Sequence, residues 1–171
     1  LPDAFYQGLQ KKVGEKLRLY PDAVCREIRE KLSGIWSVPK EWILCVNGSD
    51  ELLKMTVDLM LEPGDEIGIF DPTYSLYEVL GAIRDAKVVK FPLSREGYPD
   101  ETPFSFNGKL FIIASPNAPY GNMIPKEWTT RFLKTFKGLV LIDEAYADFA
   151  GESWISEVRN FSNLLVCQLG L

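Results

Sequence analysis

Four groups of polar residues follow short apolar stretches and carry the side chains that a site for a charged ligand needs. These groups are Asn47-Gly48-Ser49-Asp50-Glu51, Asp71-Pro72-Thr73-Tyr74, Ser115-Pro116-Asn117-Ala118-Pro119-Tyr120-Gly121 and Asp143-Glu144-Ala145-Tyr146. Together they offer backbone N–H groups for an anion, carboxylates for a cation and aromatic rings for a planar molecule. Neither GxGxxG nor a P-loop pattern (GxxxxGKS or GxxxxGKT) occurs, so a dinucleotide site or a P-loop is unsupported.

The first group has the composition of a phosphate site at the start of a helix. Gly48, Ser49 and Asp50 precede the apolar positions of an expected helix, where backbone N–H groups lack partners inside the helix and the helix dipole is positive. Ser49 or Asp50 could equally be an ordinary N-cap residue, and for this motif alone the N-cap is the better interpretation.

Asp143 follows four apolar residues, 139–142, that read as a buried strand. A carboxylate at that position lies close to the core and needs a cation or an N–H group as a partner. The protonated nitrogen of a pyridine ring would serve. A helix cap or a buried salt bridge with a basic side chain is the alternative, and it is the better interpretation for an isolated aspartate.

Two tyrosines could contact the same ligand as Asp143. Tyr74 ends its polar group and could stack on a planar ring, although most tyrosines at such positions simply pack. Tyr146 lies three residues beyond Asp143, which is one helical turn, so both side chains could face one ligand. The alternative for Tyr146 is a packed ring with a solvated hydroxyl group.

The elements that must position these groups alternate along the chain. The expected helices span residues 1–19, 23–32, 74–83 and 125–136, and another opens at Ser49; the expected strands span 66–70, 87–91, 110–114, 139–142 and 164–166. Strands that are apolar throughout and separated by helices indicate a three-layer α/β/α fold with a mostly parallel sheet. Ligands of such folds bind at the carboxyl ends of the strands, which is where the polar groups lie.

Composition removes several other classes of function. The chain has 171 residues, a net charge of −5 and no histidine, which excludes a Ser-His-Asp triad and a histidine-ligated metal within these residues. An acidic chain without a basic run is a poor candidate for binding nucleic acid or an anionic membrane. The three cysteines fit neither a disulfide framework nor a zinc motif. We therefore expect a cytoplasmic protein that binds a small molecule.

In their order and spacing, the segments NGSDELL, EPGDEIGIFDPTYSLY, SPNAPYGN and LIDEAYADF resemble histidinol-phosphate aminotransferases. These belong to the class I/II, fold-type-I aminotransferases that depend on pyridoxal phosphate. The early segment RLYPDA is similar to the tyrosine-proline segment of the same family, and the resemblance runs from about Arg18 to Cys167. Threonine-phosphate decarboxylases and aromatic aminotransferases share much of the pattern and stay open as alternatives.

The resemblance implies roles for the residues singled out above. The backbone groups of Gly48, Ser49 and Asp50 would hold the cofactor phosphate, and Tyr74 would stack on the pyridine ring. Asp143 would pair with the ring nitrogen and keep it protonated, which makes the ring an acceptor of electrons.

The resemblance also implies two further tyrosine contacts and a reaction. Tyr146 would donate a hydrogen bond to the phenolic oxygen of the cofactor. Tyr20 would reach the cofactor phosphate of a partner subunit, so the implied active unit is a homodimer. The implied reaction transfers an amino group between glutamate and imidazole-acetol phosphate, a step of histidine biosynthesis.

The chain departs from the family pattern in the turn formed by 115–121. The family has asparagine where this chain has Ala118, and an alanine side chain cannot hydrogen-bond the phenolic oxygen of the cofactor. Asn117, the other asparagine of the turn, is not an automatic substitute. Tyr120 stands where a small threonine is usual.

The second departure concerns the lysine that binds the cofactor covalently. In the family, the strand that matches 164–168 runs into a serine-lysine pair, whereas Gln168 is followed here by Leu169-Gly170-Leu171 and the last lysine is Lys137. One hypothesis is that a lysine-bearing loop is skipped between Gln168 and Gly170. We expect residues 1–171 to be a partial, inactive large domain without a catalytic lysine or the small C-terminal domain. The alternative, favoured by Ala118, is a non-catalytic homologue that binds a phosphorylated ligand or a partner protein.

Overall fold

A computed structural model of the protein describes residues 3–12 and 19–169. The chain divides into two compact units, residues 1–45 and 46–171. The assignment of all 171 residues to one partial cofactor-binding domain stays a prediction. Tyr20 lies in the first unit, and the other residues expected to bind the cofactor lie in the second.

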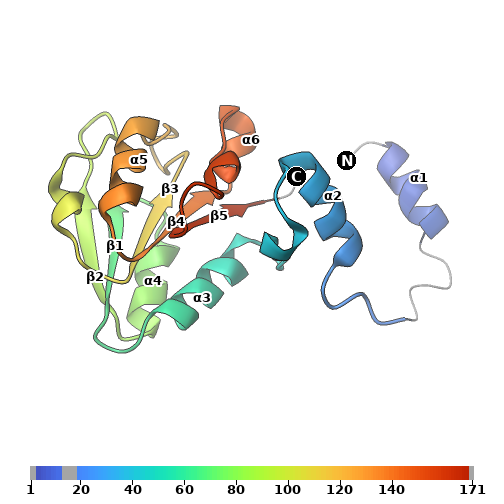
Figure 1. Ribbon diagram of the computed structural model, residues 1–171, viewed down its shortest axis with the longest axis horizontal. Coiled ribbons are helices and arrows are strands. Elements are labelled where there is room, and N and C mark those ends of the chain that lie inside the picture. Colours follow the sequence, from blue (N-terminus) through green and yellow to red (C-terminus); the bar gives the residue numbers. More distant parts are fainter. Residues whose placement is uncertain (1–2, 13–18, 170–171) are drawn as a thin grey trace. The chain divides into compact units, whose positions relative to one another are not determined.

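The first unit is helical, with α1 (Asp3–Lys12), α2 (Arg26–Trp36) and the short 3-10 helix η2 (Lys40–Trp42) (Figure 1). The helix expected over residues 1–19 is confirmed over its α1 part. Residues 13–18 of that prediction lie outside the described residues.

The helix predicted over residues 23–32 is displaced at both ends. At the start, the Asp22 carboxylate accepts a hydrogen bond from the backbone N–H of Arg26 at 2.9 Å, and the helix begins only there. At the other end, Gly34 stays helical, because an exposed glycine lowers helix stability by only about 1 kcal/mol. The helix ends at Ser37, whose backbone is left-handed with φ 54°.

The second unit is built on a five-stranded sheet in the order β2-β1-β3-β4-β5, and all neighbouring strands are parallel. Its strands are β1 (Glu66–Asp71), β2 (Lys87–Pro92), β3 (Leu110–Ala114), β4 (Leu139–Glu144) and β5 (Leu164–Gln168). Its α-helices are α3 (Ser49–Met60), α4 (Leu76–Ile83), α5 (Lys126–Thr135) and α6 (Ala147–Ala150), with 3-10 helices η3 (Thr102–Ser105) and η4 (Ile155–Glu157). All five predicted strands are therefore confirmed.

Two boundaries differ from the prediction in ways that affect the site. β4 continues past residue 142, because Asp143 and Glu144 still pair with Cys167 and Gln168 of β5. The helix expected from Tyr74 begins at Leu76. Asp143 thus lies within β4, and the alternation of the strand sets the direction of its side chain.

Helices cover both faces of the sheet, as the three-layer prediction requires (Figure 1). Side chains of α3 and α4 pack on one face in a cluster that includes Leu53, Tyr77 and Leu141. Side chains of α5 pack on the opposite face with Phe111 and Ile142. Because successive residues of a strand point to opposite faces, Asp143 continues the direction of Leu141 and Glu144 continues that of Ile142.

The face under α5 is rich in aromatic rings, and Gly68 of β1 makes room for them. A Cβ atom built on Gly68 would lie 2.4 Å from Cδ2 of Phe111 and 2.9 Å from Cε1 of Phe106. The Phe111 ring is fully buried and contacts the Phe132 ring edge to face, with centroids 4.8 Å apart. A glycine at this position is therefore required by packing rather than by backbone conformation.

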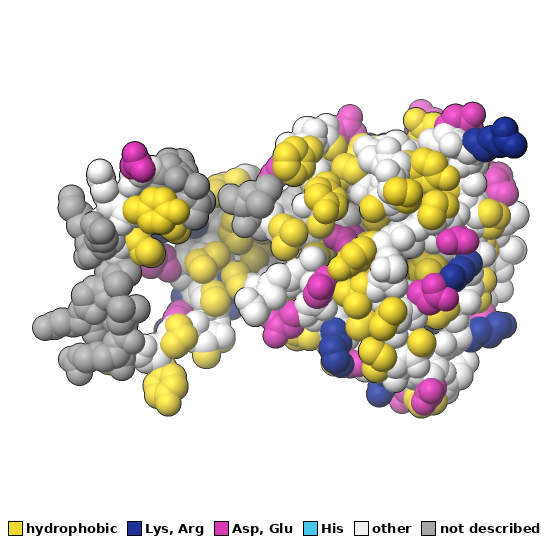
Figure 2. All heavy atoms as spheres, turned by 180° about the vertical axis from the view of Figure 1, so that it is seen from behind, with side chains coloured by type: hydrophobic (Ala, Val, Ile, Leu, Met, Phe, Trp, Pro, Cys, Tyr) yellow, Lys and Arg dark blue, Asp and Glu magenta, His cyan; other side chains and the backbone are white. Residues whose placement is uncertain are grey.

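The surface of the second unit carries charges of both signs. Figure 2 shows acidic and basic side chains interspersed with hydrophobic ones over this unit. Among the residues described, no helix combines the length and apolar character that crossing a membrane demands. The same residues contain no cluster of three or more histidine, cysteine, aspartate or glutamate side chains suited to hold a metal ion.

Candidate cofactor site

Asp143 is the second-last residue of β4, and its carboxylate is buried, with 5% of the residue's surface exposed. Its Oδ2 accepts a hydrogen bond from the Tyr77 hydroxyl at 2.7 Å, and its Oδ1 accepts one from the backbone N–H of Ala145 at 3.1 Å. Within the described ranges, no lysine or arginine forms a salt bridge with it. The salt-bridge alternative raised from the sequence therefore finds no support.

Burial dominates the electrostatics of Asp143. Removal from water raises the pKa of its carboxyl above the ordinary value, and the hydrogen bonds from Tyr77 and Ala145 lower that pKa in part. The nearby negative charge of Asp50 raises it again. A cation placed against this carboxylate would remove much of the penalty, because an opposite charge favours the ionised form.

The start of α3 presents open backbone. Gly48 is the N-cap residue, with φ 90°, and neither Ser49 nor Asp50 caps the helix. A Cβ atom built on Gly48 would meet no other atom within 4 Å. The alternative that Ser49 or Asp50 is the N-cap residue is therefore wrong, because Gly48 occupies that position. Glycine fits here, since it alone adopts positive φ without strain and brings no side chain over the helix start.

Tyr74 connects the start of α3 with Asp143. Its hydroxyl donates a long hydrogen bond to Oδ1 of Asp50 at 3.5 Å, and its ring meets the Tyr77 ring edge to face, with centroids 5.5 Å apart. Burial raises the pKa of Tyr74, and the charges of Asp50, Asp143 and Tyr146 raise it further. These couplings place Asp50, Tyr74, Asp143 and Tyr146 in one neighbourhood.

The remaining two predicted residues are tyrosines with accessible rings. Tyr146 directly precedes α6 and is 57% exposed. Tyr20 is fully exposed in the first unit. Its role beside the other residues stays a prediction.

The turn at 115–121 is fixed by Asn117. This side chain is fully buried: its Oδ1 accepts a hydrogen bond from the Thr73 hydroxyl at 2.8 Å, and its Nδ2 donates one to the Pro72 carbonyl at 3.1 Å. Both of its polar atoms therefore join this turn to the end of β1. Asn117 does not replace the asparagine that is absent at Ala118.

Two buried side chains next to Asp143 received no role from the sequence, Tyr77 and Glu144. Tyr77 lies three residues after Tyr74, a spacing that places two residues on one side of a helix and could have drawn attention to it. Glu144 is 2% exposed and accepts hydrogen bonds from the Ser153 hydroxyl at 2.7 Å and from Nε2 of Gln168 at 2.8 Å, as well as from the backbone N–H of Trp154. It ties the ends of β4 and β5 to the loop before η4.

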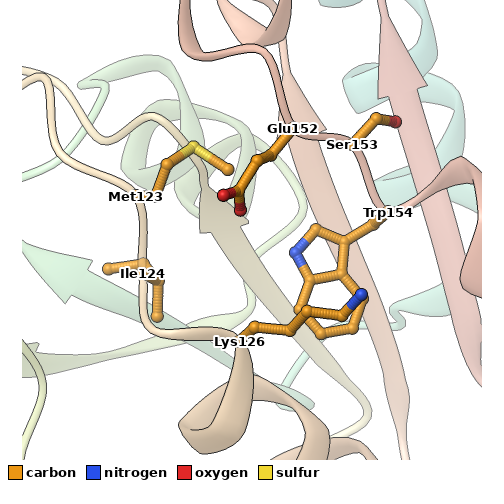
Figure 3. A pocket seen from close by; sticks show the side chains of 6 residues that line it. All are labelled: Met123, Ile124, Lys126, Glu152, Ser153 and Trp154. Atoms are coloured by element: carbon orange, nitrogen blue, oxygen red, sulfur yellow. The ribbon is translucent and has the colours of Figure 1, made fainter.

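One hollow of about 330 Å³ contains none of the predicted residues. It is lined by Met123, Ile124, Lys126, Glu152, Ser153 and Trp154 (Figure 3). The Lys126 ammonium lies 5.7 Å from the centre of the Trp154 ring and pairs with Glu157 at 2.9 Å. The positive charge of Lys126 is thus already paired with Glu157, so this hollow is a weaker candidate for a phosphate site than the start of α3.

The second-unit residues fit a flat, phosphorylated, positively charged ring. The uncapped start of α3 can accept a phosphate, since backbone N–H groups and the helix dipole both favour an anion. Asp143 is a buried acceptor that has hydrogen-bond donors but, within the described part of the chain, no basic partner, and a protonated ring nitrogen would supply a cation. Tyr74, between them, offers an aromatic ring for stacking.

Comparison with known proteins agrees with the motif pattern. The chain matches the family model for aminotransferases of class I and II over residues 1–168. The histidinol-phosphate aminotransferase of Citrifermentans bemidjiense is 36% identical over 160 residues, which are 94% of this chain and 46% of that protein. The chain therefore spans about half the length of the curated relatives it matches.

Two solved structures share the fold. The histidinol-phosphate aminotransferase of Clostridium acetobutylicum has a TM-score of 0.87 and 27% identity, covering 98% of this chain and 51% of that one. The histidinol-phosphate aminotransferase of Sinorhizobium meliloti, in complex with pyridoxal-5'-phosphate, has a TM-score of 0.84 and 18% identity, with 98% and 48% covered. With the match over residues 1–168, these findings show that the chain belongs to the aminotransferase class I and II family.

Proposed function

We propose that this chain is the cofactor-binding part of a pyridoxal-phosphate-dependent aminotransferase. Its reaction would exchange an amino group between glutamate and imidazole-acetol phosphate, as the resemblance to histidinol-phosphate aminotransferases implies. The observation that carries the proposal is Asp143, a buried carboxylate without a basic partner in the described residues, beside Tyr74 and the open start of α3.

Each residue has a distinct part in holding the cofactor. The backbone N–H groups of Gly48, Ser49 and Asp50 hold the phosphate, and Tyr74 packs on the ring. Asp143 keeps the ring nitrogen protonated, and Tyr146 donates to the phenolic oxygen. Pyridoxal phosphate supplies a ring that withdraws electrons from the α-carbon of the substrate.

The covalent anchor and proton carrier is a lysine in the resembling family, after the strand that matches β5. We assign no residue of 1–171 to that role. Sequencing the gene beyond the codon for Gln168 tests this point directly. A serine-lysine pair encoded between Gln168 and Gly170, or shortly beyond Leu171, supports the enzyme.

The assembly follows from the same proposal. Tyr20 is fully exposed, so its hydroxyl is available to the phosphate site of a second copy, and the active unit would be a homodimer. A biosynthetic enzyme of this kind would act on small metabolites in the cytoplasm. Analytical ultracentrifugation of the chain with and without pyridoxal phosphate measures the assembly.

A second candidate is favoured by the turn at 115–121. Ala118 has no side-chain donor for the phenolic oxygen, and both polar atoms of Asn117 are used inside the protein. A homologue that binds a phosphorylated ligand or a partner protein without catalysis would tolerate this loss. Absence of a lysine codon after Gln168 in the gene would support this candidate over the enzyme.

Cofactor binding by the 171-residue chain tests the site itself. Pyridoxal phosphate is titrated into the wild-type protein and followed by absorbance, with borohydride added at saturation. We expect saturable binding, and no reduction onto a lysine of the site. Asp143→Asn should weaken binding about tenfold, because a buried charge pair is lost. Asp148→Asn, an exposed aspartate of α6, is the matched control and should bind as wild type. Unchanged affinity in Asp143→Asn would remove Asp143 from the site.

A further inference from the structure

Tyr77 is the only side chain in the described residues whose hydroxyl donates a hydrogen bond to the Asp143 carboxylate. The phenol oxygen and Oδ2 of Asp143 are 2.7 Å apart, and both residues are buried, Tyr77 completely. Water cannot take over this bond from either side. With the backbone N–H of Ala145 on Oδ1, the two donors fix the plane of the carboxylate.

Tyr77 also contacts Tyr74, the residue expected to stack on the cofactor ring. Its own ring meets Tyr74 edge to face at 87°, and its backbone N–H donates to the Tyr74 carbonyl at 3.3 Å. Edge-to-face contact is a favoured geometry of aromatic pairs and restrains both rings. One residue at the start of α4 therefore contacts both Asp143 and Tyr74.

Resting on the proposed function, we propose that Tyr77 is a positioning residue that aims the Asp143 carboxylate at a pyridine ring nitrogen and restrains Tyr74 against the same ring. Tyr77 touches neither the ring nor the substrate and acts through these two residues. It selects a ring with a basic nitrogen over a ring of the same shape without one.

The charged and titratable groups around Asp143 set how this selection depends on pH. Asp50 of α3, Tyr77 of α4 and Cys167 of β5 couple electrostatically to Asp143. Burial and the Asp143 charge raise the pKa of Tyr77 far above its ordinary value, so its hydroxyl keeps its proton and remains a donor. Tyr74 and Glu144 also couple to Asp143, and Tyr77→Phe retains the ring that contacts Tyr74.

Removal of the hydroxyl has a defined consequence. The hydrogen bond from Tyr77 lowers the pKa of Asp143, so Tyr77→Phe should raise that pKa further. The Asp143 carboxylate would then be protonated at higher pH, and a protonated carboxyl no longer attracts the charged ring nitrogen. When affinity is plotted against pH, the acidic limb, where affinity falls as the pH decreases, should therefore lie at higher pH in Tyr77→Phe than in wild type.

The test compares two probes on the 171-residue chain by isothermal titration calorimetry. Pyridoxamine 5'-phosphate binds without any lysine, and its carbocyclic analogue carries C–H in place of the ring nitrogen. We expect Tyr77→Phe to weaken pyridoxamine phosphate about tenfold, as for the loss of one hydrogen bond to a charged group, and to leave the analogue within about twofold. Tyr98→Phe, at a half-exposed tyrosine, is the matched control and should change neither.

Equal weakening of both probes, or of neither, would overturn the role of Tyr77, since a merely structural tyrosine makes no distinction between them. Asp143→Asn separates this failure from failure of the proposed function. If Asp143→Asn abolishes the preference for the pyridine probe and Tyr77→Phe keeps it, the function stands and Tyr77 has no positioning role. If the wild-type chain shows no preference, both proposals are wrong.

A second variant keeps the proposal testable if Tyr77→Phe does not fold. Replacement of Tyr77 by 3-fluorotyrosine retains the ring and gives a more acidic, stronger donor. The pKa of Asp143 should fall, so the acidic limb of pyridoxamine phosphate affinity should move to lower pH. An unchanged limb would contradict the role assigned to Tyr77.

Discussion

Glu144→Ala should destabilise the second unit strongly, whereas Glu144→Gln should be nearly neutral. The Glu144 carboxylate accepts hydrogen bonds from the buried backbone N–H of Trp154, from the Ser153 hydroxyl and from the Gln168 amide. Alanine leaves the Trp154 N–H buried without an acceptor, which costs about 1–3 kcal/mol, and removes side-chain packing worth about 0.8 kcal/mol per methylene group. We therefore expect the free energy of unfolding to fall by about 2–4 kcal/mol.

Glutamine preserves most of these contacts. Its oxygen can accept from the Trp154 N–H, and its NH₂ group can donate to the Ser153 hydroxyl oxygen or to the Gln168 carbonyl after that amide turns over. It also removes a buried charge. The change in the free energy of unfolding should thus stay within about 1 kcal/mol.

The comparison of Glu144→Gln with wild type should depend on pH. Burial raises the pKa of Glu144 above its ordinary value of 4.5, in spite of the hydrogen bonds that lower it. A raised pKa in the folded state gives stability that is present below the unfolded value and is lost as the pH rises through the folded one. Wild type should therefore lose stability relative to Glu144→Gln as the pH increases above 4.5.

Urea unfolding followed by tryptophan fluorescence measures all three proteins, since Trp128 and Trp154 are buried in the second unit. Glu152→Gln, at an exposed residue of the neighbouring loop, is the control and should unfold as wild type at every pH. Equal destabilisation by alanine and glutamine, or a loss below about 1 kcal/mol for alanine, would refute the hydrogen-bonding argument.

Two further predictions concern stability without ligand. Relative to wild type, Asp143→Asn should gain stability as the pH rises above 3.8, the ordinary value for an aspartate, because burial raises the pKa of Asp143 and its charged form is disfavoured; a thermal shift that does not vary with pH would contradict this. Gly68→Ala should lower the free energy of unfolding by about 1–3 kcal/mol, because its Cβ would overlap Phe111, and Phe111→Leu in the same chain should cancel part of the loss. Additive effects in that urea-unfolding cycle would argue against direct overlap.

Patterns within the sequence were enough to predict the sheet. All five strands were found, and β3 (Leu110–Ala114) agrees with the prediction at both ends. Its five residues are buried, so the apolar run by itself indicates a strand covered on both faces. The start of α2 was missed because a hydrogen bond from the Arg26 N–H to the Asp22 carboxylate decides where that helix begins.

Candidate site residues could be proposed from the sequence, but the hydrogen bonds that connect them could not. Asp143, Tyr74 and Asp50 could be chosen because each follows a strand or opens a helix. The bond from Tyr77 to Asp143 joins residues 66 positions apart, and that from Gln168 to Glu144 joins residues 24 apart. Pairings over such separations depend on strand order and on the face that each side chain takes, and periodicity does not reveal them.

The two adjacent carboxylates at the end of β4 differ in their surroundings, and the difference supports the role proposed for Asp143. Asp143 and Glu144 are both buried, and burial raises the pKa of both. The alternation of a strand sends them to opposite faces. Glu144 meets hydrogen-bond donors from a loop and from β5, so its acceptors are used by the protein itself. Asp143 has donors from Tyr77 and Ala145 and, in the described residues, no basic partner, and it lies where Tyr74 and Asp50 also converge. Neither carboxylate forms a salt bridge with a lysine or arginine of the described residues, but Asp143 is the one whose charge couples to Tyr74, beside the start of α3, where a bound ring would supply a cation.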